Sequence, residues 1–344
     1  MPIILMPLFT PGTCVSLLKK MVTRVEGKIT EVRQTESGDI SEVVLESGQA
    51  VAGDLFVDCS GFASLLMDKT LETEFEDWTH WLPCDRAIAV QTKSVSEPVP
   101  FTRSIARESG WQWRIPLQNR VGNGLVYCNE FMNDDEARDI LLSNLEGEVI
   151  KEPRVLHFRT GQRVKHWNRN CVALGLAAGF LEPLESTSIH LIQRGVIRLL
   201  QMFPHGGIVE SDREEFNRQM DTEFRFIRDF IIMHYHVTER TDSEFWRRCR
   251  EMDIPDSLQH RLNLFRDTGR VFETELDIFR ENSWTQVMLG QGIEPKSYHP
   301  IVDMMDEQEL RQFMQFQRQK VDHVLGQLPT HQEFIDRYCP TASA

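Results

Sequence analysis

The chain has 344 residues, 41% of them hydrophobic and 26% charged, which is ordinary for a globular protein and enough for two lobes around a substantial core. It carries 38 Lys and Arg against 52 Asp and Glu, so its formal net charge is −14. This charge repels phosphate backbones and anionic membrane surfaces, and we expect neither a nucleic-acid partner nor a membrane partner.

The seven cysteines are scattered, with no CxxC pair and no histidine at metal-ligand spacing. The sequence therefore predicts no metal site and no disulfide framework, and the odd number of dispersed thiols favours a cytoplasmic location. The apolar opening, MPIILMPLFTPGTC, has no basic residue before it and is interrupted by prolines, which predicts neither a signal peptide nor a membrane span. Because no clean helix or strand periodicity precedes Leu17, we expect a poorly ordered or strained start to the chain.

Short strands and turns dominate the first part of the chain. Three runs between Lys28 and Asp58, separated by turns that contain Gly and Asp, predict three strands. The last run, DLFVD, is almost continuously apolar and is followed by Cys59-Ser60-Gly61. It is typical of a buried strand whose C-terminal end opens onto a turn, the place where open α/β sheets bind ligands.

Strand-like and helical patterns separate further along the chain. Several β-like runs between residues 86 and 129 predict an antiparallel sheet, and a helix is expected at Asp134–Asn144. A short apolar run at Val172–Gly175 enters the loop LAAGFLEPLESTSIH, which a helical pattern follows. The rest is mostly helical, with amphipathic stretches at 212–237, 241–250, 256–267 and 306–327. The expected fold is mixed α/β (α+β).

The loop after Val172–Gly175 is the strongest candidate site. Its small residues at positions 175–179 allow the backbone to approach a flat or anionic ligand closely. Glu185 precedes Ser186, Thr187 and Ser188, which stand where a helix begins, and the N–H groups of a first helical turn bind anions such as halide or phosphate. The alternative is that Ser186 or Thr187 is only an N-cap and Glu185 a solvated carboxylate near a favourable helix dipole.

Tryptophans provide a second set of candidates. Trp111 and Trp113 have period-2 spacing in a strand-like run and would share one sheet face, either in the core or as a wall that faces a ligand. Trp284 lies in an apolar helical segment and is either a core residue or the wall of a pocket for an aromatic substrate.

Histidines are weaker candidates. His234 and His236 are two residues apart on an expected helix, so they face apart and do not predict a metal site. His190 falls on the apolar side of its helix, where a buried, hydrogen-bonded core residue is the expected role.

Five segments together resemble the flavin-dependent tryptophan halogenases. They are DLFVDCSGFASLL (54–66), WLPCDRAIAV (81–90), GWQWRIP (110–116), GFLEPLESTSIHL (179–191) and HYHVTERTDSEFW (234–246). The WxWxIP signature together with the PLEST loop is the most specific part, since DxSG alone is widespread among flavoproteins. The resemblance covers nearly everything from about Val25 to the C-terminus.

This resemblance implies a partial flavin-monooxygenase-like domain with an antiparallel substrate sheet and a helical C-terminal lobe. The implied segments are 1–65, a remnant of the FAD-binding domain; 66–170, the sheet region for substrate; 171–205, the return to the FAD-binding domain with the halide and flavin loop; and 206–344, the helical lobe.

The function implied by the resemblance is FAD-dependent halogenation of an electron-rich aromatic, such as tryptophan or another indole. In the family, reduced FAD, oxygen and halide give hypohalous acid, which travels through a tunnel to the aromatic carbon, while the protein supplies positioning and electrostatics. The expected partners are the aromatic substrate, a halide ion and a separate flavin reductase from which reduced FAD diffuses. A homodimer is left open.

The family's functional residues carry over by position. Glu185 matches the active-site glutamate, which orients substrate and oxidant and stabilises the positive charge of the halogenation intermediate. Thr187 and Ser188 match the residues whose backbone N–H groups hold the halide. Three positions match flavin contacts: Leu176, Ile189 and the more distant Val25. Trp111 and Trp113 match the signature tryptophans between the flavin and substrate chambers, which are interpreted as discouraging direct oxygenation. The substrate or chamber wall as a whole is assigned to five positions: Trp111, Trp113, Ile115, Pro116 and Trp284.

Three departures from the family pattern limit what carries over. Ser188 stands where tryptophan-specific members have Gly, so a φ above zero there would strain the backbone. Trp284-Thr285 replaces a Tyr-Tyr stretch that helps those enzymes to bind tryptophan, so another indole, a phenol or a pyrrole fits as well. No GxGxxG fingerprint occurs and no lysine can be assigned the family's role of handling the oxidant, so we expect an N-terminally truncated member.

Whether this chain is an enzyme therefore stays open. The first possibility is a halogenase that truncation has impaired. The second is a flavin monooxygenase on the same scaffold, and the third is a non-catalytic remnant of the substrate lobe.

Overall fold

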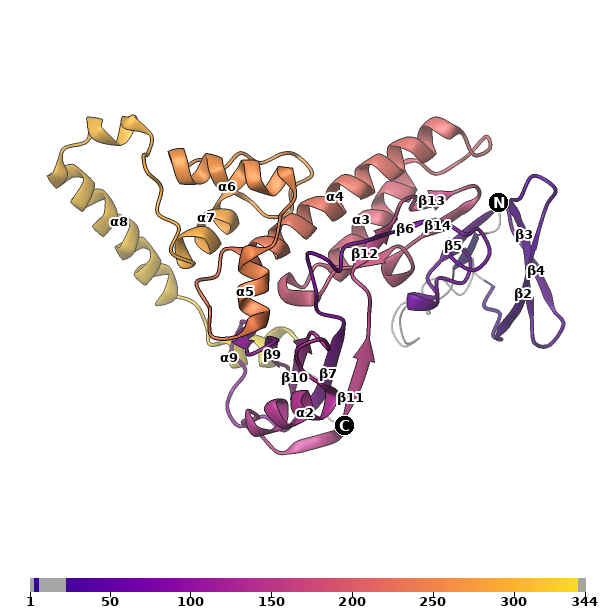
Figure 1. Cartoon of the computed structure of the whole chain (residues 1–344), viewed down its shortest axis with the longest axis horizontal. Helices are drawn as coiled ribbons and strands as arrows, with labels where there is room; N and C mark the ends of the chain where they lie inside the picture. The colour runs from indigo at the N-terminus through magenta and orange to yellow at the C-terminus, as the bar shows by residue number, and fades with distance from the viewer. Residues whose placement is uncertain (1–2, 6–22, 340–344) are drawn as a thin grey trace. The chain divides into compact units, whose positions relative to one another are not determined.

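The computed structural model describes residues 3–5 and 23–339 (Figure 1). It divides into two compact units. Unit 1 contains the chain up to Leu82, Phe158–Ile231 and Thr274–Ile278, and unit 2 contains Pro83–His157, Ile232–Glu273 and the chain from Phe279 onward. The division into four segments that the family resemblance implies stays a prediction.

Unit 1 contains a four-stranded sheet in the order β1-β5-β14-β13. Its strands are β1 (Ile3–Leu5), β5 (Leu55–Asp58), β14 (Cys171–Ala173) and β13 (Trp167–Asn168). β1 and β14 pair with β5 in parallel, and β13 pairs with β14 in antiparallel. All four residues of β5 are buried, as the continuous apolar run predicted.

The poorly ordered or strained start expected before Leu17 does not extend to Ile3–Leu5, which form a strand. These three residues form β1 because they pair with Leu55–Val57 on β5. A strand of three residues is too short to show an alternating pattern, so its structure depends on the tertiary pairing and not on local periodicity. The rest of that opening segment, residues 1–2 and 6–16, lies outside the described residues.

Two smaller sheets complete the strands of unit 1. β2 (Ile29–Gln34), β3 (Ile40–Leu45) and β4 (Ala50–Ala52) form an antiparallel meander. β15 (Gly179–Phe180), β12 (Gly161–Arg163) and β6 (Phe75–Asp77) form a second antiparallel sheet in that order. The predicted strands between Lys28 and Asp58 are thus confirmed, with β4 as an additional short strand before β5.

Short helical turns connect the strands of unit 1 to two longer helices. The 3₁₀ turns are η1 (Gly61–Ala63), η2 (Gly175–Ala177) and η3 (Pro183–Glu185), and the longer helices are α3 (Ser188–Gln201) and α4 (Glu210–His236). The succession of strand, loop and helix predicted after residue 172 is therefore confirmed as β14, η2, β15, η3 and α3.

Unit 2 is built on a five-stranded antiparallel sheet in the order β11-β7-β10-β9-β8. Its strands are β7 (Arg86–Thr92), β8 (Arg103–Arg107), β9 (Gly110–Pro116), β10 (Val121–Tyr127) and β11 (Val149–His157). The helix α2 (Asp134–Ser143) covers one face, where Leu141 joins Ile88 and Leu125 in an apolar core (Figure 1). The predicted antiparallel sheet is confirmed.

The remaining elements of unit 2 are helical. They are α5 (Glu244–Glu251), α6 (Asp256–Thr268), α7 (Glu281–Gly290), η4 (Pro300–Met304), α8 (Glu307–Leu325) and α9 (His331–Tyr338). The chain is therefore mixed α/β, and the helical stretches expected from amphipathic patterns are confirmed. Among the described residues, no helix combines the length and apolar character needed to cross a bilayer.

Candidate functional site

The candidate loop is shaped by two tight turns in unit 1. Pro183 begins η3, and Ser186 ends it in the left-handed conformation with φ +55°, donating its N–H to the carbonyl of Pro183 at 3.1 Å. The chain then enters α3, whose N-cap is Thr187. Ser188 is not among the described non-glycine residues with positive φ, so the strain considered for Ser188 falls on Ser186 instead.

Thr187 has the features of a residue at an anion site. It is only 2% exposed, and its hydroxyl has no hydrogen-bond partner among residues 3–5 and 23–339. Its carbonyl accepts from the N–H of Leu191 at 3.0 Å, which starts the helical hydrogen bonding of α3. The N–H groups before Leu191 have no partner within the helix, and the positive end of the helix dipole lies there. A small anion fits this combination of donors.

Carboxylates stand next to this helix start. Glu185 is the last residue of η3 and is half-buried, two positions before Thr187. Glu182 is the N-cap of η3 and is fully buried. The sequence pattern singled out Glu185 but not Glu182, because burial of a loop residue gives no periodic signal.

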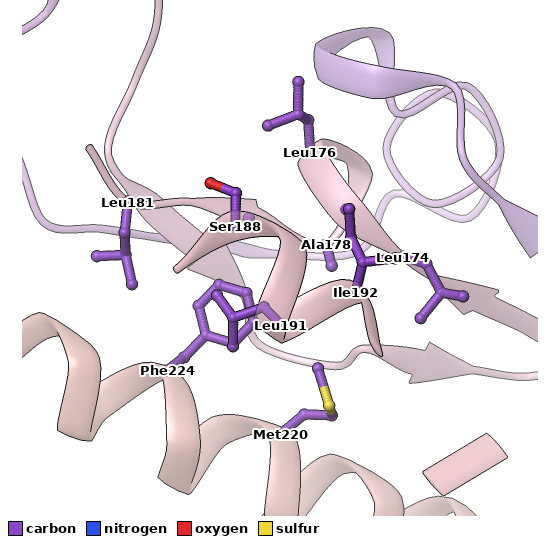
Figure 2. A pocket seen from close by; sticks show the side chains of 11 residues that line it. Leu174, Leu176, Ala178, Leu181, Ser188, Leu191, Ile192, Met220 and Phe224 are labelled. Carbon is purple, nitrogen blue, oxygen red and sulfur yellow. The ribbon is translucent and has the colours of Figure 1, made fainter. Parts of the chain in front are cut away.

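A small cavity lies between the loop, α3 and α4 (Figure 2). Its volume is about 30 Å³. The lining is almost entirely apolar and consists of Leu174, Gly175, Leu176, Ala178, Gly179, Leu181, Ser188, Leu191, Ile192, Met220 and Phe224. This volume holds about one water-sized species, so neither a flavin ring nor an indole fits inside it.

The carboxyl ends of two parallel strands meet beside this loop. β5 continues into η1 and β14 into η2, and the two turns are in contact. Small residues at such an edge, including Gly175 with φ +65°, allow a flat ligand to approach the backbone. The residues present suit the edge of a flavin ring, whereas a glycine-rich cradle for its pyrophosphate does not occur in this sequence.

Asp58 holds the turn after β5. This fully buried carboxylate accepts from the N–H and hydroxyl of Ser60 at 2.9 and 2.6 Å, and from the N–H groups of Leu66 and Met67 at 2.8 and 3.0 Å. Burial, with a contribution from Asp58, raises the pKa of the Cys59 thiol to about 12, so Cys59 stays protonated.

The same turn presents an aromatic side chain that the sequence pattern did not single out. Phe62 is 53% exposed, and its ring is perpendicular to that of Phe180 with centroids 5.3 Å apart. Phe180 in turn contacts Phe158 at 4.9 Å between centroids. An aromatic cluster therefore flanks the loop on the side of η1.

The expected flavin contacts lie at different places in unit 1. Leu176 is half-buried in η2 and lines the cavity, and Ile189 is 60% exposed in the first turn of α3. The structure thus brings Leu176 and Ile189 to the same loop and helix as Thr187. Val25 precedes β2 and is exposed.

The tryptophan signature lies on β9 in unit 2. Trp111 and Trp113 share a sheet face, as predicted, with ring centroids 6.0 Å apart. Trp111 is buried and Trp113 is half-buried. Ile115 continues this face, and Pro116 ends the strand on the opposite face.

Trp284 lies on α7 of unit 2 and is only 1% exposed. The guanidinium of Arg261 lies over its ring at 4.2 Å from the centroid.

His190 differs from its expected role as a buried core residue. Its side chain is 31% exposed, and its Nε2 lies 2.8 Å from Oε1 of the buried Glu223 on α4. The expectation of burial was wrong because His190 lies at the edge of the apolar stripe, where a polar partner on α4 satisfies it. His166 shows the opposite case: it is fully buried, and burial lowers its pKa to about 4.

Known proteins match this chain over most of its length. A sequence model of the family described as tryptophan halogenase matches residues 16–307. The tryptophan 7-halogenase of Kutzneria sp. (strain 744) is 34% identical over 340 residues, which cover 93% of this chain and 64% of that protein. A flavin-dependent halogenase from Xanthomonas campestris has a TM-score of 0.93 at 52% identity and covers 96% of this chain and 68% of its own. One from Brevundimonas sp. BAL3 has a TM-score of 0.90 at 41% identity, covering 94% of this chain and 66% of its own.

The solved structures that this fold matches at 52% and 41% identity are flavin-dependent halogenases. The chain belongs to the tryptophan halogenase family, which confirms the resemblance seen in the motifs. It spans 64% of the length of the Kutzneria relative.

Proposed function

We propose that this chain carries the halide-binding loop and the aromatic-chamber wall of an enzyme that halogenates an electron-rich aromatic with reduced FAD, oxygen and halide. One observation supports this most directly: the buried Thr187 hydroxyl without a partner among the described residues, at the N-terminus of α3. A buried polar group without a partner costs free energy, so a ligand that satisfies it is favoured there.

Each residue of the loop has a distinct proposed role. The N–H groups of Thr187 and Ser188, at the positive end of α3, hold the halide. Glu185 orients the substrate and the oxidant and stabilises the positive charge that develops on the aromatic ring. Reduced FAD, when bound, supplies the electrons that activate oxygen.

The flavin is proposed to contact the loop at Leu176 and Ile189, with Val25 as a more distant contact. The exposed side chain of Ile189 and the glycine-containing turn η2 support this placement. A separate flavin reductase supplies reduced FAD by diffusion. The six described cysteines are all free thiols, which fits a reducing cytoplasm, and a homodimer is compatible with this function.

The proposed substrate is an aromatic with a nucleophilic carbon, such as an indole, a phenol or a pyrrole. The half-buried Trp113, together with Trp111 and Ile115, forms one face of the unit 2 sheet and supports a flat apolar wall for such a ring. Pro116, which ends this strand, and Trp284, which is buried on α7, are assigned to the same proposed wall.

The test is a product analysis of the purified chain with FAD, a flavin reductase, NADH, oxygen, indole and bromide. The expected result is bromoindole in mass spectrometry, absent without bromide and absent in Glu185→Gln. An oxygenated indole that forms with or without bromide would indicate a monooxygenase instead. No product, together with no quenching of flavin fluorescence relative to Leu176→Asp, would identify a non-catalytic remnant and overturn the proposal.

A further inference from the structure

One buried carboxylate on α4 receives three basic side chains from α3. Glu223 is 1% exposed. Its Oε1 lies 2.8 Å from Nε2 of His190 and 3.3 Å from Nε of Arg194, and its Oε2 accepts from Nη1 of Arg198. Because a carboxylate can only accept, Nε2 of His190 is the donor in this pair. We call Glu223 and its three partners the α3 clamp.

The spacing of the clamp makes it a constraint on the rotation of α3. Its basic residues stand at positions 190, 194 and 198, four residues apart, so they lie one above the other on one side of the helix. A rotation of α3 about its axis would move all three away from the same carboxylate. The rotation of the helix is therefore tied to the position of Glu223.

A second contact fixes how closely α3 approaches the sheet. A Cβ at Gly195 would lie 2.5 Å from Cδ2 of Leu174, so the helix backbone rests directly on the residue that follows β14. By contrast, several apolar side chains of α3 are exposed: Ile189, Val196, Ile197 and Leu200. The face of α3 that carries the clamp residues and Gly195 is therefore the face that packs against the rest of unit 1.

The clamp reaches the proposed halide loop through the first turn of α3. Thr187 caps this helix, and the first helical hydrogen bond joins Leu191 to Thr187. His190 lies within that turn and is the first member of the clamp. Glu223 restrains the rotation of α3 about its axis, and this rotation sets the directions of the N–H groups at the helix start.

We propose that Glu223 is a positioning residue for the halide site: it aims the first-turn N–H groups of α3 without contacting the halide. This inference rests on the proposed function of the loop. Two other roles predict different results. A purely electrostatic role would mean that removal of the negative charge raises anion affinity, and a purely structural role would leave the affinity of the folded protein unchanged.

The first experiment is a chloride titration of the full chain, in which binding is read from the ³⁵Cl NMR line width and excess bromide, added as a competitor, defines the non-specific part. We expect Glu223→Gln to weaken chloride binding at least about fivefold. Misalignment of the first-turn N–H groups would remove much of the free energy that a hydrogen bond to an ion contributes. The matched control is Glu214→Gln, which removes a carboxylate at an exposed position on the same helix. Unchanged or tighter chloride binding by folded Glu223→Gln would overturn the proposal.

Milder variants cover the case in which Glu223→Gln does not fold. His190 is half-exposed, so His190→Leu removes one member of the clamp with little loss of packing. His190→Gln restores a donor near the position of Nε2. We expect His190→Leu to weaken chloride binding and His190→Gln to retain it; equal affinities in both would count against positioning.

Hydrogen exchange separates this inference from the proposed halide site itself. Positioning requires faster amide exchange in the first turn of α3 in Glu223→Gln or His190→Leu than in Glu214→Gln. If the wild-type chain shows no chloride binding that excess bromide displaces, the halide part of the proposed function fails. Faster exchange would then still assign Glu223 to the orientation of α3, whereas unchanged exchange would reject the clamp as well.

Discussion

The indole ring of Trp113 lies against the backbone of Gly124 on the neighbouring strand, and a Cβ at position 124 would be 2.0 Å from Cζ2 of that ring. The two residues are directly opposite in the register of β9 and β10. The ring can lie flat on the sheet only because position 124 has no side chain. Gly124 therefore determines the orientation of one of the two signature tryptophans.

We predict that Gly124→Ala displaces the Trp113 indole and destabilises the chain by about 1–3 kcal/mol, the usual cost of overpacking. The measurement is urea denaturation together with near-ultraviolet circular dichroism, which reports the coupling of Trp111 and Trp113. Gly122→Ala on the same face of β10 is the control, because its Cβ would meet no atom closer than 3.9 Å. Equal spectra and stabilities for the two variants would contradict this account of the ring's position.

Thr187→Val should separate stability from anion binding. In a halide-free buffer the buried hydroxyl has no described partner, so its replacement by a methyl group should raise the free energy of unfolding by roughly 1 kcal/mol. The same change should weaken chloride or bromide binding, because a polar donor is lost at the helix start. Thr187→Ser keeps the hydroxyl and should retain binding. A Thr187→Val variant that is less stable and binds halide normally would show that the hydroxyl has a structural partner instead.

The elements of this fold could largely be predicted from local patterns, whereas their tertiary contacts could not. The continuous apolar run of β5 predicts a buried strand, and the amphipathic run of α4 predicts a helix with one buried face, because both patterns can be read from neighbouring residues. The strand β1 could not be foreseen, since three residues acquire their structure only from pairing with β5.

The candidate site shows the same limit. Glu185, Thr187 and Ser188 could be found because a motif places them in one loop. Glu223 lies 33 positions after His190 and is brought to it only by the packing of α4 against α3. No spacing rule in the sequence connects two residues on separate helices, so a buried acceptor of this kind becomes visible only in the fold.

Asp58 offers a test of the turn that carries Phe62. We predict that Asp58→Asn lowers the free energy of unfolding by about 2–3 kcal/mol, because an amide replaces a buried charged acceptor and turns one of its oxygens into a donor that faces N–H groups. Chemical denaturation measures this loss. Asp54→Asn, at an exposed position just before β5, is the control and should change stability little. If Asp58→Asn kept the wild-type stability and lost only flavin binding, the conformation of the turn would not depend on Asp58.

His166 makes stability depend on pH in a defined window. Burial lowers its pKa from 6.5 to about 4, so the folded state binds this proton less readily than the unfolded state does. Stability from this group is complete above pH 6.5 and is lost progressively as the pH falls toward 4, with about 2 kcal/mol lost between pH 7.5 and 5.

The check is chemical denaturation of the wild type and of His166→Gln at pH 7.5 and pH 5. His166→Gln keeps a donor near Nε2, which lies 3.1 Å from Oε1 of Gln162 in the wild type, but it cannot take up a proton. We expect the variant to lose less stability than the wild type between the two pH values, whereas His260→Asn, at an exposed position on α6, should behave as the wild type does. An equal loss in wild type and His166→Gln would mean that other groups carry the acid sensitivity of this chain.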